Sequence, residues 1–132
     1  MSSDLIWNIV KKNNAFKIER NGTVLSCEPG NLRNKHSIKY SGLARKNVID
    51  VAAQNGKIVV SSRVVKKVAF PATANKTTTF TTNNSRKTAR FVKTLATQYA
   101  PELRAAALGR LNRVQSSLKA AKLAQARKAK KN

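Results

Sequence analysis

Side chains able to do acid–base, nucleophilic or metal chemistry are few in this sequence. There is one histidine, His36, one cysteine, Cys27, and five carboxylates scattered from Asp4 to Glu102. No two carboxylates have the spacing of a paired acid and base, and no glycine-rich phosphate loop, nucleophile elbow or metal-ligand cluster occurs. We therefore expect no enzymatic activity, no metal site and no cofactor.

Lysine and arginine supply the chemistry that remains. They number 27 among 132 residues, against five Asp and Glu, which gives a formal net charge of +22. Self-repulsion at this density weakens a compact state unless a polyanion neutralises it. Nucleic acid is the expected partner, bound mainly through phosphate contacts and counterion release. A chromatin-type DNA binder is an alternative, but basic residues on Ala-rich helical sequence after Arg86 favour an extension that threads through RNA.

Fourteen basic residues are the predicted phosphate contacts. Arginine is favoured because its fork grips two phosphate oxygens or stacks on a base. The predicted RNA-binding residues are Arg20, Arg33, Lys35, Arg45, Lys46, Arg63, Lys66, Lys67, Arg86, Lys87, Arg90, Arg104, Arg110 and Arg113.

Two aromatic side chains could stack on bases or belong to the core. Trp7 lies beside an apolar helical stripe, so a core anchor is the favoured interpretation. Tyr40 shares a predicted strand face with Ile38, so the core is again favoured and base stacking stays open.

The elements that position these side chains follow from local patterns. A short helix should start near Asp4, capped by Ser2 or Ser3, and end at Asn13-Asn14. Asn21-Gly22 and Asn55-Gly56 are two-residue hairpin turns. Folding about them pairs Ile18 with Leu25, Phe16 with Cys27, Val51 with Val60 and Ala53 with Ile58.

Further along, a short strand is expected at Ser37–Ser41, and residues 66–84 form a linker or an extended strand. Ser85 should cap a helix over about 86–99, and Pro101 should open another. That last helix carries a narrow apolar stripe from Leu103 to Ala121, surrounded by basic residues.

Together these elements predict an α+β fold, with a small antiparallel sheet of about five strands covered by the N-terminal helix, followed by a basic helical C-terminal extension. We divide the chain into a compact platform at 1–70, a linker or extended segment at 71–84 and an extension with a tail at 85–132. Residues 51–132 carry eighteen basic side chains and one acidic, so we expect this part to follow a phosphate surface.

The cysteine count, the lengths of the apolar runs and the first residues indicate in which compartment the protein is expected. One cysteine allows no disulfide framework and fits a reducing compartment. Apolar runs are too short to span a membrane, and the first residues lack the pattern of a secretory signal.

Several short motifs resemble a known family. They are Leu5-x-Trp7, Phe16 through Asn21, Glu28-Pro29-x-Asn31-Leu32, Ser37-x-x-Tyr40-x-Gly42-Leu43, Pro71-Ala72-Thr73 and Tyr99-x-Pro101-x-Leu103-Arg104. In this order they are similar to the eukaryotic large-subunit ribosomal protein family L28e, over roughly residues 4–113. Departures concentrate in residues 44–70 and after 114.

The resemblance implies a structural constituent of the large (60S) subunit of the cytosolic ribosome, assembled in the nucleolus, without catalytic activity. Its implied partners are large-subunit ribosomal RNA and neighbouring large-subunit proteins, with no membrane and no homo-oligomer. A ribosome-assembly factor is the nearest alternative. The similar nucleolar assembly-factor family is Cys-rich near its start and carries long acidic stretches, both absent here.

Overall fold

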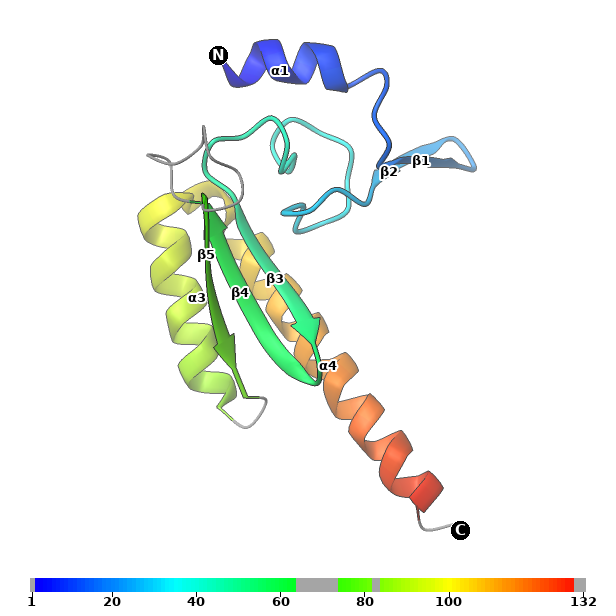
Figure 1. Ribbon diagram of the computed structural model, residues 1–132, viewed down its shortest axis with the longest axis vertical. Helices are drawn as coiled ribbons and strands as arrows, with labels where there is room; N and C mark the ends of the chain where they lie inside the picture. The colour runs from blue at the N-terminus through cyan, green and yellow to red at the C-terminus, as the bar shows by residue number, and fades with distance from the viewer. Residues whose placement is uncertain (1, 64–73, 82–83, 130–132) are drawn as a thin grey trace.

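The computed structural model describes residues 2–63, 74–81 and 84–129, and it places five strands in two antiparallel sheets (Figure 1). A two-stranded sheet follows the N-terminal helix, and a three-stranded sheet lies against the C-terminal helices. The predicted α+β class and the number of strands are confirmed. The division into two sheets was not foreseen.

The N-terminal helix α1 (Ser3–Val10) forms as its caps predict. Ser2 is the N-cap, and its hydroxyl accepts a hydrogen bond from the Leu5 N–H at 3.2 Å. The Asn14 side-chain amide donates to the Val10 carbonyl at 3.0 Å and satisfies one of the carbonyls that a helix end leaves unpaired. The helix ends slightly earlier than predicted.

Both hairpins have the predicted registers. Strands β1 (Lys17–Arg20) and β2 (Thr23–Ser26) pair Ile18 with Leu25. Strands β3 (Ile49–Gln54) and β4 (Lys57–Arg63) are joined by the Asn55-Gly56 turn, and they pair Val51 with Val60 and Ala53 with Ile58. The Asn and Gly of each turn have positive φ angles, which the tight turn of a two-residue hairpin requires.

Strand β5 (Asn75–Phe80) is the fifth strand, inside the segment predicted as a linker or extended strand. It pairs with β4, so that Phe80 lies opposite Ile58 and Thr78 opposite Val60. Sheet order is therefore β3-β4-β5. Threonine suits a half-buried strand.

The strand predicted at 37–41 is wrong. The Tyr40 and Ser41 N–H groups both donate to the Ser37 carbonyl, at 3.1 and 3.0 Å, so this segment is a turn. The Ser41 hydroxyl also donates to Glu28. These local and side-chain hydrogen bonds replace the sheet ladder that an isolated alternating pattern suggested.

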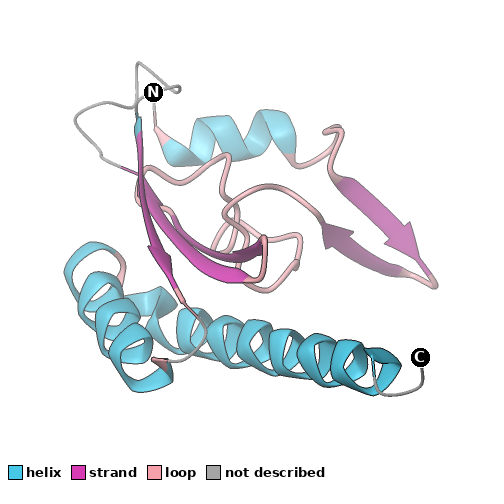
Figure 2. Cartoon of the chain, turned by 60° about the horizontal axis from the view of Figure 1, so that its bottom comes forward, coloured by secondary structure: helices cyan, strands magenta, loops and turns pink. Residues whose placement is uncertain are grey.

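Two helices cover the three-stranded sheet (Figure 2). Helix α3 (Ser85–Tyr99) is followed by a 3-10 turn, η2 (Pro101–Leu103), and by the long helix α4 (Arg104–Ala129). Pro101 opens the new helical segment as predicted. Ser85, however, is the first helical residue rather than the cap, which is Asn84 and makes no side-chain cap bond.

The core forms between one face of the sheet and these helices. Buried sheet residues Ile49, Val51, Ile58 and Val60 cluster with buried residues of α3 and α4: Val92, Ala96, Ala107 and Leu111. Phe80 on β5 contacts Phe91 on α3, with ring centroids 5.0 Å apart. Phe91 therefore fixes α3 to the sheet.

The predicted cover by the N-terminal helix is wrong. No residue of α1 is buried, whereas α3 and α4 contribute five buried residues, and Ala100 and Leu103 between the two helices are buried as well. The sheet face was predicted correctly, but an eight-residue helix offers less apolar surface than two long ones. Whether 1–70, 71–84 and 85–132 behave as separate units stays a prediction.

The loop between the hairpins is held by a buried carboxylate. Glu28 accepts hydrogen bonds from the Asn31 amide and from the Ser41 hydroxyl, each at 3.0 Å. Asn31 also donates to the Lys35 carbonyl. Gly42 lies so close to the chain that a Cβ there would be 2.0 Å from the Pro29 carbonyl oxygen. We call residues 28–44 the knotted loop, and the word refers to these internal hydrogen bonds and close contacts rather than to the topology of the chain.

Candidate RNA-binding surface

Most of the predicted phosphate contacts lie on the surface. Lys66 and Lys67 fall outside the described residues. The exposed members of the set are Arg20, Arg33, Lys35, Lys46, Arg86, Lys87, Arg90, Arg104 and Arg113.

Three predicted arginines are half-buried and hydrogen-bonded within the fold. Arg45 forms an ion pair with Glu102 and donates to the Lys39 carbonyl at 3.1 Å. Arg63 donates to the Arg45 carbonyl at 3.1 Å, and Arg110 donates to the Val51 carbonyl at 3.4 Å. These arginines connect the loop, the sheet and α4, and their part in RNA binding stays a prediction.

The surroundings of Glu102 favour its charged form. A backbone hydrogen bond, helped by the Arg45 guanidinium and the charge of Lys39, holds the pKa of Glu102 below its ordinary value of 4.5. The ion pair with Arg45 ties the residue that follows the knotted loop to η2, just before α4.

A cationic cluster surrounds Tyr40 on the knotted loop. The Arg33 guanidinium carbon lies 5.8 Å from the centre of the Tyr40 ring, and the Lys39 ammonium lies 5.7 Å from it. Hydrogen bonding with Arg33, together with the charges of Lys39 and Lys35, lowers the pKa of Tyr40 from 10.0. The ring is partly buried against the core, as the favoured interpretation of Tyr40 predicts, and base stacking stays a prediction.

Lys39 was missed by the sequence analysis. Its place beside Tyr40 in the sequence was the available signal, because a basic residue next to an aromatic one is typical of RNA-binding surfaces. With Arg33 and Lys35, Lys39 makes the knotted loop a compact basic surface.

A second basic group follows the exposed side of α3. Arg86, Lys87 and Arg90 are exposed there, and Lys93 continues the row one turn further on. Arg90 and Lys93 also line a shallow groove of about 550 Å³ with Thr94, Thr97 and Gln98. Arginine and lysine beside hydroxyl and amide groups suit contacts with a phosphate backbone.

The third basic group is the distal part of α4, which extends past the sheet (Figure 1). From Lys119 to Ala129 every residue is exposed. Ala107 and Leu111 are the buried residues of this helix, so the apolar stripe predicted up to Ala121 stops contributing to the core after Leu118. Lysine and arginine recur along this exposed segment between alanines, which suits contact with a phosphate backbone.

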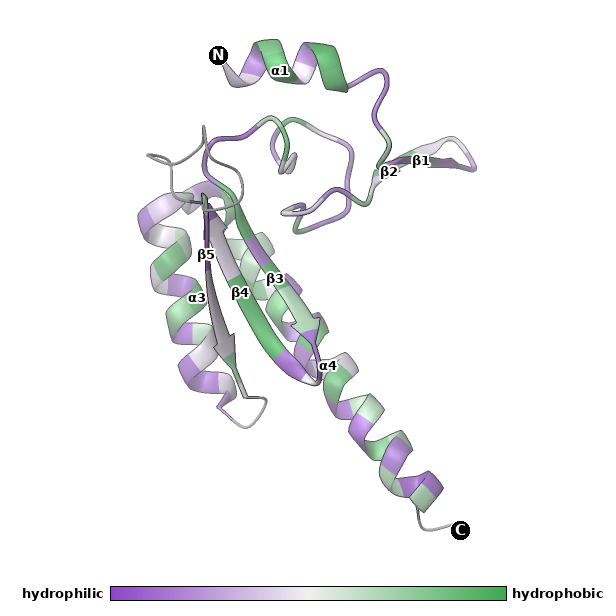
Figure 3. Ribbon diagram, viewed as in Figure 1, coloured by the Kyte–Doolittle hydropathy of each residue, from purple (hydrophilic) through white to green (hydrophobic). Residues whose placement is uncertain are grey.

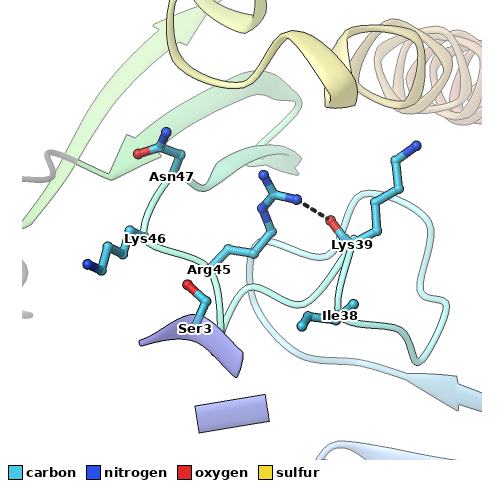
Figure 4. A pocket seen from close by; sticks show the side chains of 6 residues that line it. All are labelled: Ser3, Ile38, Lys39, Arg45, Lys46 and Asn47. Atoms are coloured by element: carbon cyan, nitrogen blue, oxygen red, sulfur yellow. Dashed lines mark hydrogen bonds between the residues drawn. The ribbon is translucent and has the colours of Figure 1, made fainter. Parts of the chain in front are cut away.

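An open pocket of about 460 Å³ lies between α1 and the knotted loop (Figure 4). Its lining combines Ser3 and Ile38 with the basic side chains of Lys39, Arg45 and Lys46. The Arg45 guanidinium is turned towards the Lys39 carbonyl, and the Lys46 side chain points away from Arg45 and Lys39. The basic groups therefore do not converge on one point.

Chemistry other than phosphate binding has little support among the described residues. They hold no group of three or more His, Cys, Asp and Glu side chains that could bind a metal ion.

His36 helps to hold α1. Its Nε2 lies 2.9 Å from the Lys11 carbonyl oxygen, and its ring contacts the Trp7 ring. Trp7 is half-buried there and is not part of the main core.

Across the part of the chain that the structure describes, no helix combines the length and the apolar character that crossing a membrane requires.

Comparison with known proteins agrees with this description. The model of the Ribosomal L28e protein family matches residues 5–117. The large ribosomal subunit protein eL28 of Dictyostelium discoideum is 74% identical over 132 residues, which is all of both chains. The eL28 of Caenorhabditis elegans is 37% identical over 99 residues, covering 70% of this chain and 79% of its own. That of Schizosaccharomyces pombe is 29% identical over 93 residues, covering 67% and 69%.

The matched residues run from α1 through both hairpins and the knotted loop into α4, so they include the basic groups of the knotted loop and of α3, whereas the distal part of α4 lies beyond the match. The resemblance found in the short motifs is confirmed, and this chain belongs to the Ribosomal L28e protein family.

Proposed function

We propose that the protein is a structural constituent of the large (60S) subunit of the eukaryotic cytosolic ribosome. It binds ribosomal RNA through phosphate contacts, supports translation without catalysing a reaction, and is assembled in the nucleolus before it works in the cytoplasm. The observation that carries the proposal is the combination of family membership with three exposed basic groups on a chain of net charge +22.

Each basic group has its own task in this proposal. The knotted loop, with Arg33, Lys35 and Lys39 around Tyr40, contacts a folded RNA surface. The row on α3 and the distal part of α4 follow phosphate backbones. Lys66 and Lys67 remain proposed contacts on sequence grounds, whereas Arg45, Arg63 and Arg110 add positive charge while they hold the fold.

Sedimentation distinguishes a constituent from an assembly factor. Cell extracts are separated on sucrose gradients after a moderate salt wash, and the tagged protein is followed across the fractions. We expect it in mature large subunits and in translating ribosomes. Its restriction to precursor particles would overturn the proposal in favour of an assembly factor.

The phosphate-contact model is tested with the purified full chain and a structured large-subunit RNA fragment. The logarithm of the binding constant should fall linearly with the logarithm of salt concentration, with a slope that corresponds to several phosphates. A DNA duplex of equal length should compete poorly. A flat salt response or preference for the duplex would contradict the model.

A further inference from the structure

The charge of this protein is divided unevenly between its N-terminal unit and the rest. We define the N-terminal unit as residues 2–32, which include α1 and the β1–β2 hairpin. It carries four basic and three acidic side chains, and residues 33–132 carry twenty-three basic and two acidic. The unit is therefore almost neutral beside a strongly cationic remainder.

Exposed apolar side chains gather in the same unit. Leu5 and Ile9 lie four residues apart on α1, so they share one face, and Ile9 is 66% exposed. Ile18 and Leu25 lie opposite each other on one face of the hairpin and are 36% and 39% exposed. Five of the seven exposed large apolar side chains in the described residues belong to this unit: Leu5, Ile9, Phe16, Ile18 and Leu25.

Residues 28–32 of the unit are held in the knotted loop and the core, whereas α1 and the hairpin strands hold one buried residue, Ser26. Figures 1 and 2 both draw α1 and the hairpin away from α3 and α4, and Figure 3 shows hydrophobic residues along α1. His36 contacts Lys11 and Trp7 of α1, and the hairpin is joined to the following loop by the backbone pairing of Leu25 with Lys35 and by the Ser26 N–H, which donates to the Asn34 carbonyl. An eight-residue helix and a lone hairpin are both marginally stable in water.

We propose that the exposed apolar faces of α1 and the hairpin form a docking surface for a neighbouring protein of the large subunit. The occupant presents an apolar patch without a strong charge of its own, matching the near-neutral unit. The inference rests on the proposed function and adds a division of labour: the apolar faces of the N-terminal unit bind protein, and the RNA contacts, Arg20 apart, belong to the cationic remainder.

Two other occupants fit less well. RNA presents charged phosphates, and a unit of net charge +1 attracts them far less than the remaining hundred residues do. A second copy of this chain would bring two molecules of charge +22 together, which their repulsion opposes.

Photo-crosslinking within purified large subunits tests the proposal. The photoreactive residue benzoylphenylalanine replaces Ile9 or Ile18 in the full chain, and Leu123 in a matched control. Leu123 is also exposed and apolar but lies on the cationic part of α4. We expect Ile9 and Ile18 to give a ribonuclease-resistant adduct with one defined large-subunit protein, and Leu123 to give an adduct that ribonuclease removes.

The alternative outcomes overturn the proposal. An RNA adduct from Ile9 and Ile18, an adduct between two copies of this chain, or no adduct from either position while Leu123 reacts with RNA would each exclude a protein docking surface and leave the proposed function standing. Absence of the full chain from large subunits would overturn the proposed function itself.

A pair of substitutions gives an independent measurement. Ile18→Thr with Leu25→Thr places a β-branched residue at both hairpin positions and removes apolar surface. We expect dissociation from washed subunits to become about tenfold faster, while the affinity of the purified variant for the RNA fragment stays unchanged. Val24→Thr, on the other hairpin face, is the control. Unchanged dissociation of the double variant, with circular dichroism like that of the original protein, would count against the docking surface.

Discussion

At the scale of single residues, the arginines of this protein divide between exposed ones, which we propose as phosphate contacts, and half-buried ones that hold the fold. Arg86 is exposed on α3, whereas Arg110 is half-buried and donates to the Val51 carbonyl. Residue type alone could not separate them, because both occur on basic helical sequence. The difference depends on where α4 lies against β3.

Two alanine substitutions separate these roles. Arg86→Ala should weaken RNA binding and reduce the salt slope by about one, without changing stability. Arg110→Ala should lower the free energy of unfolding by about 1 kcal/mol, because a hydrogen bond and packing of the side chain are lost. RNA titrations at several salt concentrations and urea denaturation measure both. Equal loss of stability in the two variants would contradict the assignment.

Glu102 makes stability depend on pH. Its pKa in the folded protein lies below 4.5, so its contribution is present above about pH 4.5 and is lost as the pH falls through the folded value. Because the carboxylate is 41% exposed, we expect a contribution below about 1 kcal/mol. Glu102→Gln should remove that contribution at pH 7 and make little difference at low pH.

Urea denaturation between pH 3 and pH 7 measures this dependence, and Arg45→Gln supplies a double-mutant cycle. The coupling between the two substitutions should be seen at pH 7 and disappear under acidic conditions. Coupling that persists at low pH would show that the pair acts through packing rather than charge.

At the scale of elements, the knotted loop is the part that most depends on close packing. Glu28 and Ser41 are buried and hydrogen-bonded to each other across thirteen residues. The sequence motifs around them pointed to the family, but they did not reveal that they meet. Their role in the structure is to hold Arg33, Lys35 and Lys39 in one basic cluster.

Two glycine substitutions test this packing. Gly42→Ala should destabilise the protein by about 2 kcal/mol, because the added Cβ would collide with the backbone at Pro29. Gly109→Ala meets no atom within 4 Å and should stabilise α4 by about 0.5 to 1 kcal/mol. Thermal and urea denaturation of the two variants measure the contrast. A neutral Gly42→Ala would mean that the loop is looser than the structure indicates.

At the scale of the whole molecule, the part of α4 that packs in the core is separate from the exposed part that we propose as an RNA contact. Its first turns pack Ala107 and Leu111 into the core, and its last turns from Lys119 onward are exposed. This arrangement lets one helix serve both the fold and a charged partner. The net charge of +22 then concentrates outside the core rather than disrupting it.

Removal of residues 119–132 tests that separation. The truncated chain loses six positive charges, so its RNA affinity should fall and its salt slope should decrease by up to about four to five. The free energy of unfolding should change by less than about 0.5 kcal/mol, because the described residues removed are exposed. A large loss of stability would show that the distal helix supports the fold.

The sequence by itself determined the features that depend on neighbouring residues or on the sum of charges. The Asn-Gly turns and the alternation of apolar residues specified both hairpin registers, because turn geometry and a two-residue period act locally. The balance of charged residues predicted a polyanionic partner, whatever the fold.

Only the tertiary structure decided which parts meet. It selected α3 and α4 over α1 as the cover of the sheet, turned residues 37–41 into part of the knotted loop, and made β5 the fifth strand. It also placed Arg45, Arg63 and Arg110 within the fold. These outcomes depend on competition between apolar surfaces that are distant in the sequence and on hydrogen bonds between separate segments. Local sequence patterns cannot predict the result of that competition.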